Sequence, residues 1–333
     1  MTKKPILADV ARAAGVSMMT VSRAINNKPG VSDKVRQEIQ TLAAEMGFQP
    51  NQIARSLVTH QSATIGLVVP DITNPFFAQI ARGVEDLAYE AGYSLFLLNS
   101  AENLKREAVA FNSLQQKEID GAILCSSRHR ESDLRVQAQR FPAVVLVNRE
   151  LKDPLPNVVT INVNDQRGAQ LATQHFLEQN RAQIACISGP ANSVSAQRRL
   201  QGYRACLKDA GRPFDPRLVE PCVPTIEGGQ AAAAALLARC PGLDAVLAFN
   251  DLAAIGAMLA CQDAGKGVPR DVAVIGADNI FLAGLVRPRL STLNVNLGHI
   301  GRLAMRSLLD IIQGTGAPAA IQIEPELILR DSA

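Results

Sequence analysis

The apolar positions of the first 50 residues repeat at intervals of three and four, the spacing of one helical face. A first helix is predicted over residues 7–14 and ends at Gly15, and Ser17 can cap a second helix with its hydroxyl. Ser32 can cap a third helix, which ends at Gly47. The expected inward positions are Leu7, Val10, Ala11, Ala14, Val21, Ile25, Val35, Ile39, Leu42, Ala43 and Met46.

From residue 64 onward the pattern changes, and short continuous apolar runs alternate with helical segments. The predicted strands are 65–71, 94–100, 121–127, 143–149, 183–189, one near 219, 245–250 and 272–278. The predicted helices between them are 75–92, 104–118, 132–140, 195–211, 227–240 and 251–265. Continuous apolar strands between helices are typical of parallel sheets covered on both faces. The expected fold class is therefore α/β: a small all-α domain followed by a two-lobed domain with parallel sheets.

The domain bounds follow from this change of pattern. We expect a helix-turn-helix domain over residues 1–50, a connector over 51–62 and the two-lobed domain over 63–333. Chain crossings between the lobes are expected near 160–163, 292–296 and 319–322, with helix 298–313 returning to the first lobe. These crossings assign residues 63–161 and 294–319 to lobe one, and 162–293 and 320–333 to lobe two.

Two helices joined by a tight turn suggest DNA recognition, because the second helix of a helix-turn-helix enters the major groove. Arg23 has the forked donors that bind guanine O6 and N7, and Met18 and Met19 can meet thymine methyl groups. Thr20 and Ser22 are expected to contact phosphates. The alternative is an ordinary three-helix bundle in which Arg23 is only solvated and the methionines fill the core.

Several motifs resemble those of one family along nearly the whole chain. They are DVARAAGVSMMTVSRAINN, GFQPN, ARSL, IGLVVPDITNPFFAQIARGVEDLAYEAGYSL, DGAIL, PAVVLVNR, GAQLATQHFLEQN, AFNDLAAIGAM, VAVIGADN and RPRLSTLNVN. In order and spacing they are similar to the LacI family of bacterial transcription regulators. The resemblance implies a helix-turn-helix head and a sensor domain like a periplasmic sugar-binding protein.

The connector has a pattern of its own. Asn51 can cap a short helix after Pro50, but residues 52–57 are too few to hold a helix unaided in water. The resemblance implies a hinge helix that folds when two copies pack on DNA and that inserts Leu57 between base pairs of the minor groove. Asn51 and Ala54 would then lie on the same groove-facing side. The alternative is a linker in which Leu57 packs on the next domain.

The positive charge is concentrated in the first 62 residues. They carry eight Lys and Arg against four Asp and Glu, a balance of +4, whereas the whole chain of 333 residues has a balance of +3. A basic head predicts phosphate binding that weakens steeply with added salt.

Other features exclude several classes of protein. No apolar run reaches the roughly 18 residues of a membrane span, and no secretory signal is present, so we expect a cytoplasmic protein without a membrane partner. Six dispersed cysteines and four dispersed histidines predict no metal site, no disulfide framework and no cofactor. The chain shows neither a Ser-His-Asp arrangement nor a phosphate-binding loop, which argues against an enzyme. A secreted solute receptor would have no use for a DNA-binding head.

Ligands of two-lobed parallel folds lie at the carboxyl ends of the strands, where the lobes face a shared cleft. Polar residues at these ends predict a site for a small polyol, which needs carboxylate acceptors, guanidinium and amide donors, and an apolar face. The resemblance adds an arginine from the helix after residue 195 and an acceptor in GADN. The candidate effector-binding residues are Asn74, Phe76, Ser126, Arg149, Asp165, Arg199, Asn250 and Asp278.

These residues leave several alternatives open. Asn74 can also close the turn after the first strand, Asn250 can also cap the helix that starts at residue 251, and Ser126 also suits an ordinary loop. Two cleft arginines, Arg149 and Arg199, also fit an acidic ligand such as a sugar acid or a sugar phosphate. The sequence leaves open whether the ligand releases DNA or promotes binding. A homodimer is expected because one head contacts only half of a palindromic operator, and helices 75–92 and 104–118 are its predicted contact surface.

Overall fold

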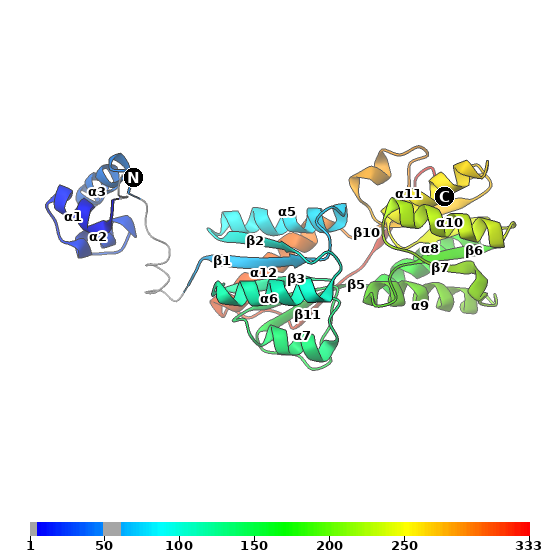
Figure 1. Cartoon of the computed structure of the whole chain (residues 1–333), viewed down its shortest axis with the longest axis horizontal. Helices are drawn as coiled ribbons and strands as arrows, with labels where there is room; N and C mark the ends of the chain where they lie inside the picture. Colours follow the sequence, from blue (N-terminus) through cyan, green and yellow to red (C-terminus); the bar gives the residue numbers. More distant parts are fainter. Residues whose placement is uncertain (1–4, 49–60) are drawn as a thin grey trace. The chain divides into compact units, whose positions relative to one another are not determined.

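The computed structural model describes residues 5–48 and 61–333, and it divides into two compact units, residues 1–62 and 63–333 (Figure 1). Within the described residues, no helix combines the length and the apolar content needed to cross a bilayer.

The first unit contains the three predicted helices, α1 (Leu7–Ala14), α2 (Met18–Ile25) and α3 (Asp33–Glu45). Ser17 Oγ accepts the Thr20 amide at 3.1 Å, and Ser32 Oγ accepts the Val35 amide at 3.5 Å, so both predicted caps are confirmed. Gly15 ends α1 with φ of 65°, a left-handed conformation that glycine adopts without strain. Side chains from all three helices form one small core: Val10, Ala11, Val21, Ala24, Ile39 and Ala43.

Lobe one of the second unit is a fully parallel sheet of six strands in the order β11-β5-β4-β3-β1-β2. The strands are β1 (Thr64–Val69), β2 (Ser94–Asn99), β3 (Gly121–Cys125), β4 (Val144–Val147), β5 (Val158–Val163) and β11 (Ala320–Ile323). The helices are α5 (Pro75–Glu90), α6 (Leu104–Gln116), α7 (Glu131–Ala138) and α12 (Leu297–Gln313). Helices α5 and α12 pack on one face of the sheet, and α6 and α7 pack on the other.

Lobe two repeats this layout with the sheet order β12-β10-β9-β8-β6-β7, in which only β12 is antiparallel. The strands are β6 (Ile184–Ser188), β7 (Val219–Pro221), β8 (Ala245–Ala248), β9 (Ala273–Asp278), β10 (Ser291–Asn294) and β12 (Glu326–Ile328). The helices are α8 (Asp165–Glu178), α9 (Val194–Asp209), α10 (Ile226–Arg239) and α11 (Asp251–Asp263), with short 3-10 turns η1 (Pro216–Leu218) and η2 (Phe281–Gly284). The helices again lie in two layers, α10 with α11 and α8 with α9.

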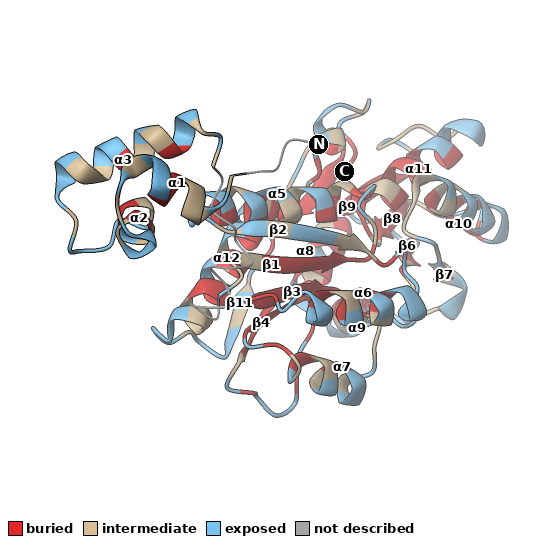
Figure 2. Cartoon of the chain, turned by 60° about the vertical axis from the view of Figure 1, so that its left-hand side comes forward, coloured by how far each residue is buried: buried red, intermediate tan, exposed pale blue. Residues whose placement is uncertain are grey.

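Burial explains why these strands are apolar throughout. Ile65 and Leu67 of β1 face the core under α5 and α12, and Val68 faces the core under α6, because successive side chains of a strand point to opposite faces. Figure 2 shows β1 and β3 buried between helices, whereas the edge strand β2 is largely exposed.

The chain crosses between the lobes three times, near the predicted places, but all three switches fall later than expected. Residues 162–163 end β5, and residues 320–323 form β11, so both segments belong to the sheet of lobe one and not to lobe two. The reason is pairing: β11 adds to β5 in parallel register, with Ile321 opposite Ile161. Asn294 ends β10 in the sheet of lobe two.

Glycines let neighbouring helices of this unit approach closely, as in the pair formed by α5 and α12. A Cβ on Gly301 would lie 2.1 Å from the carbonyl oxygen of Ile80, and one on Gly83 would lie 2.2 Å from that of Gly298. Backbone atoms cannot yield as a flexible side chain can. The two helices therefore pack at a separation that only glycine permits.

We expect Gly301→Ala to lower the free energy of unfolding by about 1–3 kcal/mol, because the added methyl group forces α5 and α12 apart. Gly298→Ala is the matched control on the same helix, since a Cβ there meets nothing within 4 Å. Chemical denaturation of the two variants measures the difference. Equal stabilities of the Gly301 and Gly298 variants would contradict the close-packing argument.

Candidate functional site

The exposed face of α2 carries the predicted DNA-reading side chains. Met18 and Met19 are 56% and 64% exposed, so the alternative that they fill the core is wrong. The Thr20 hydroxyl hydrogen-bonds the capping Ser17 Oγ at 2.9 Å, and Ser22 is half-buried. The Arg23 side chain is exposed, and its guanidinium makes no hydrogen bond or ion pair with the described part of the chain. Its donors are available to a partner outside the domain.

Two side chains of α3 fix the turn that follows α2. The Arg36 guanidinium donates to the carbonyl oxygens of Arg23, Lys28 and Val31 at 3.3, 3.0 and 3.3 Å. Gln40 Nε2 donates to the Ala24 carbonyl oxygen at 3.0 Å. These bonds reach the last turn of α2 and the loop that follows it, and so join both to α3. Arg36 is thus a positioning residue for the helix that carries Arg23.

The remaining predicted DNA contacts, Asn51, Ala54 and Leu57, lie outside the described residues.

A cavity lies between the two lobes of the second unit, at the carboxyl ends of their strands. Its volume is about 40 Å³, which is enough for a few water molecules. Lobe one contributes Asn74, Phe76, Phe77, Glu102, Ser126, Arg128 and Asn148, and lobe two contributes Ser193, Ser195, Arg199, Pro224, Phe249, Asn250 and Asp278. The cleft is therefore nearly filled by its own side chains in this conformation.

Arg199 of α9 is the central cation of this cavity. Its Nε donates to Asp165 Oδ1 at 2.8 Å, and its Nη2 lies 3.7 Å from Asp278 Oδ1. Its Nη1 donates to the Phe249 carbonyl oxygen, and the guanidinium carbon lies 5.0 Å from the centre of the Phe249 ring. One arginine thus joins the start of α8, the residue after β8 and the end of β9.

Burial and charge act in opposite directions on this cluster. Burial alone would lower the pKa of Arg199, but the carboxylates of Asp165 and Asp278 outweigh burial and raise it. Burial raises the pKa of Asp278 well above its ordinary value, and Arg199 only partly offsets this. Asp278 also has φ of 112°, a strained conformation for a residue with a side chain.

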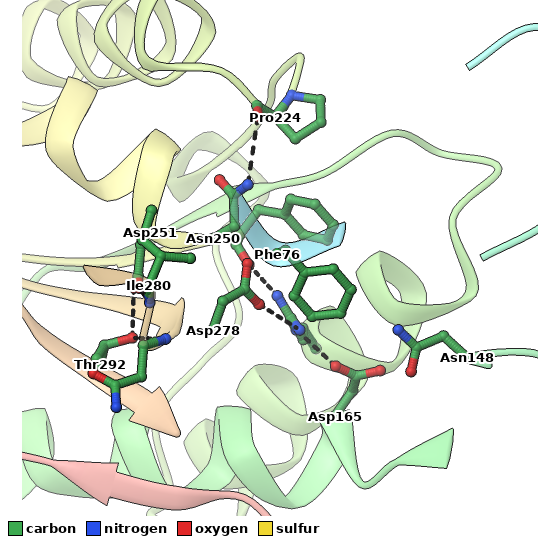
Figure 3. Close-up of polar contacts among 12 residues, drawn as sticks. Phe76, Asn148, Asp165, Pro224, Asn250, Asp251, Asp278, Ile280 and Thr292 are labelled. Carbon is green, nitrogen blue, oxygen red and sulfur yellow. Dashed lines mark hydrogen bonds and ion pairs between the residues drawn. The ribbon is translucent and has the colours of Figure 1, made fainter. Parts of the chain in front are cut away.

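Asp251 lies behind Asp278 and is fully buried. Its carboxylate accepts the Ile280 amide at 2.8 Å and the Thr292 hydroxyl, as Figure 3 shows, and so fixes the loop after β9. Burial raises its pKa to about 7.

We expect Asp251→Asn to flatten the dependence of stability on pH. A folded pKa above the unfolded value means that the stabilising contribution is complete below about pH 4 and is lost as the pH rises through about 7. An asparagine keeps an acceptor for the Ile280 amide without a charge. As the pH rises from 4 to 8, the free energy of unfolding of the variant is therefore expected to increase by up to about 4 kcal/mol relative to that of the natural protein. Urea unfolding across this pH range measures the difference in unfolding free energy between the two proteins. A difference that does not change with pH would contradict a raised pKa for Asp251.

Six of the eight predicted effector residues line the cavity: Asn74, Phe76, Ser126, Arg199, Asn250 and Asp278. Asn74 and Asn250 also cap helices, since Asn74 Oδ1 accepts the Phe76 amide at 3.0 Å and Asn250 Oδ1 accepts the Ala253 amide at 2.9 Å. Capping leaves the amide nitrogen of Asn74 as a donor, and Asn250 Nδ2 donates one hydrogen to the Pro224 carbonyl oxygen at 3.4 Å and keeps its second hydrogen for another acceptor.

Two predicted effector residues are not among the lining. Arg149 is buried and donates to the carbonyl oxygens of Ser127 and His129 at 2.6 and 2.8 Å, so it supports the turn after β3. Asp165 is 4% exposed and accepts a hydrogen bond from Arg199, whose direction it fixes.

Eight residues of the lining were not predicted from the sequence: Phe77, Glu102, Arg128, Asn148, Ser193, Ser195, Pro224 and Phe249. Asn148 shows the reason. Its φ of 57° turns the chain after β4, so Asn148 lies at the cavity while its neighbour Arg149 turns back into lobe one. Asn148 Oδ1 is buried and has no partner within the described residues. Only the AVVLVNR motif, with two polar residues after a strand, offered a signal.

Together, a helix-turn-helix head and a two-lobed cleft define a DNA-binding protein with a small-molecule sensor. Comparisons with known proteins agree. Residues 6–51 match the model of bacterial regulatory proteins of the lacI family, and residues 62–331 match the model of periplasmic binding proteins and the sugar-binding domain of the LacI family. The chain belongs to the LacI family of bacterial transcription regulators.

Individual relatives cover nearly the whole chain. The ribose operon repressor of Escherichia coli K12 is 36% identical over 98% of each chain, and the regulator GalR of the same strain is 33% identical over 97% of this chain and 94% of its own. The structure of the Lac repressor dimer bound to operator and the anti-inducer ONPF has a TM-score of 0.90 at 26% identity over 99% of each chain. The CelR–cellobiose complex has a TM-score of 0.75 at 32% identity over 99% of this chain and all of its own.

Proposed function

We propose that this protein represses genes for carbohydrate uptake or catabolism and that a small sugar in the interlobe cavity controls its affinity for operator DNA. The observation that carries the proposal is the cavity, which combines buried polar groups from both lobes with aromatic side chains. The ribose repressor and the cellobiose complex among its relatives support a sugar as the ligand.

The chemistry of the lining suits hydroxyl groups. The carboxylate of Asp278 and the unpartnered Asn148 Oδ1 are acceptors, and Arg199 and the Asn250 amide are donors. Phe76 offers an apolar face for the C–H surface of a sugar ring, and it lies close to Asn250 and Asp278 in Figure 3. A buried acceptor without a donor costs stability, and a ligand hydroxyl would relieve that cost.

Binding requires the lobes to move. Because the cavity holds only a few waters, we infer that a sugar enters a more open conformation and that the lobes close on it. Asn164 Nδ2 donates to both carboxylate oxygens of Glu324 at 3.0 Å, which ties the first crossing to the third. A ligand that favours one lobe arrangement shifts the whole population toward it.

We propose a homodimer formed through lobe one. The edge strand β2 exposes Phe96 and Leu97, and the adjoining helices expose Tyr89, Leu104 and Val109. An exposed edge strand beside apolar side chains favours pairing with another chain. A dimer presents two heads to a palindromic operator, as in the Lac repressor dimer. We further propose that it acts in the cytoplasm, as a regulator and not as an enzyme.

The test has two parts. A thermal-shift screen of the full chain against pentoses, hexoses and disaccharides is expected to raise the melting temperature with at least one sugar. Selection from fragments of the source genome is expected to recover palindromic DNA. Absence of any sugar-dependent shift together with absence of sequence-selective DNA binding would refute the proposal.

A further inference from the structure

Arg128 and Glu102 form a charge pair in the wall of the cavity that lobe one contributes. Arg128 Nε lies 2.7 Å from Glu102 Oε2, and Nη2 lies 3.0 Å from Oε1, so both carboxylate oxygens are engaged. The Arg128 side chain is 8% exposed and that of Glu102 is 35% exposed. A forked pair of this kind is among the strongest side-chain contacts in proteins.

The backbone holds both partners in place. Glu102 follows β2 and Arg128 follows β3, and these strands flank β1, so the pair spans the carboxyl end of β1. Ala101 and Glu102 have φ of 48° and 55°, which is unfavourable for residues with a side chain. The Arg128 amide donates to Glu107 Oε2 at 3.2 Å, and Glu107 is itself buried. This turn keeps a strained shape that delivers Glu102 to the arginine.

The pair changes the charge that a ligand meets. The charged residues of the lining are Arg128, Arg199, Glu102 and Asp278, two of each sign. Arg199 faces Asp278 and Asp165, and Arg128 faces Glu102, so each cation of the lining has a carboxylate partner. The third arginine of the region, Arg149, donates to backbone carbonyls away from the lining.

An anionic ligand would therefore find no spare cation and two carboxylates. Each carboxylate charge is offset by its arginine, so an anion would lose its hydration in the cleft without an unpaired cation to compensate for the loss. An uncharged polyol has no charge to desolvate, and it uses the remaining N–H groups of Arg128 and the oxygens of Glu102 as hydrogen-bonding partners.

We propose that the Arg128–Glu102 pair determines the specificity of the cleft, admitting uncharged sugars and rejecting sugar acids and sugar phosphates. The proposal rests on the sugar-binding function above and adds the class of sugar. Glu102 determines the preference for uncharged sugars, because its carboxylate cancels the charge of Arg128.

The test replaces Glu102 with Gln, which keeps the side-chain size and one acceptor but leaves Arg128 without a counter-charge. The probes are D-ribose, D-glucose and D-galactose, their acids D-gluconate and D-galacturonate, and the phosphates D-ribose 5-phosphate and D-glucose 6-phosphate. Calorimetry of the full chain is expected to give binding of an uncharged sugar only. Glu102→Gln is expected to gain at least tenfold in affinity for an acid or phosphate.

Glu85→Gln is the matched control, since Glu85 is exposed on α5 of the same lobe and is not part of the lining. It removes the same charge and is expected to leave the preference unchanged. The inference is overturned, but the sugar-binding function is not, if the natural protein binds acids as tightly as uncharged sugars. The same holds if the Glu102 variant shows no increase in affinity for acids or phosphates. Absence of binding by every probe refutes the sugar-binding function itself.

If Glu102→Gln does not fold, Arg128→Gln tests the same pair in the opposite direction. The uncovered Glu102 carboxylate is expected to favour cationic amino sugars over their uncharged parents by at least fivefold, measured with D-glucosamine and D-galactosamine against D-glucose and D-galactose. Equal affinities for amino and parent sugars overturn the inference.

Discussion

Arg199→Met is expected to abolish sugar binding and to lower the free energy of unfolding by about 3–5 kcal/mol at pH 7, because it leaves two buried carboxylates without their cation. The loss includes the hydrogen bonds to Asp165 and to the Phe249 carbonyl oxygen. No other cation of the described chain forms an ion pair with Asp165 or Asp278.

The destabilisation is expected to depend on pH in a defined direction. Burial already raises the pKa of Asp278, and removal of Arg199 raises it further. Because the pKa of Asp278 is higher in the folded than in the unfolded chain, stability falls as the pH rises above the unfolded value near 4. The difference in unfolding free energy between the variant and the natural protein is therefore expected to shrink as the solution is acidified. Denaturant unfolding at several pH values measures this narrowing.

Arg198→Met is the matched control, because Arg198 is the next residue on α9 and pairs with the exposed Glu150 at 2.7 Å. It is expected to cost less than about 1 kcal/mol and to retain sugar binding. Unaltered sugar affinity in Arg199→Met would remove this residue from the site.

Arg23→Ala is expected to reduce operator affinity by about 1–3 kcal/mol, roughly 5- to 150-fold, while affinity for unrelated DNA falls much less. The side chain is exposed on α2 without an intradomain partner, and its fork matches the acceptors of guanine. The specific complex therefore loses base contacts, whereas the phosphate contacts of other residues remain. Sugar affinity is expected to stay unchanged, because Arg23 belongs to the other compact unit.

Arg12→Ala provides the comparison, since it removes the same charge from α1, where Arg12 lies beside Asp9. Its effect is expected to be small and equal for operator and unrelated DNA. Arg36→Met is expected to reduce operator affinity by an amount between those of Arg23→Ala and Arg12→Ala, because the turn after α2 loses three hydrogen bonds to its carbonyl oxygens. Anisotropy with labelled duplexes measures all three variants, and an equal loss for Arg23 and Arg12 would contradict a role in base recognition.

Much of the fold was predictable from local pattern. The capping serines Ser17 and Ser32, the helical spacing of apolar residues and the continuous apolar strands placed the helices and strands near their observed bounds. The short strand β11 was assigned to the wrong lobe, because its place is set by pairing with β5 some 160 residues earlier and not by its own sequence.

The cavity was only partly predictable, because side-chain direction depends on the backbone at each strand end. The sequence predicted Arg149 at the site, but the left-handed φ of its neighbour Asn148 places Asn148 at the cavity and turns Arg149 away from it. Glu102 and Arg128 are 26 residues apart and meet only when β2 and β3 flank β1. Neither the direction of the Asn148 side chain nor the pairing of Glu102 with Arg128 can be predicted from a short stretch of sequence.

We propose that the cleft and the DNA-binding head are coupled. The direct measurement is anisotropy of a labelled operator duplex with the full chain, titrated with the sugar found in the screen, together with calorimetry of that sugar with and without operator. We predict that saturating sugar changes operator affinity at least tenfold and that operator changes sugar affinity by the same factor, since coupling between two binding sites is reciprocal. If both ligands bind and neither affects the other, the account is contradicted.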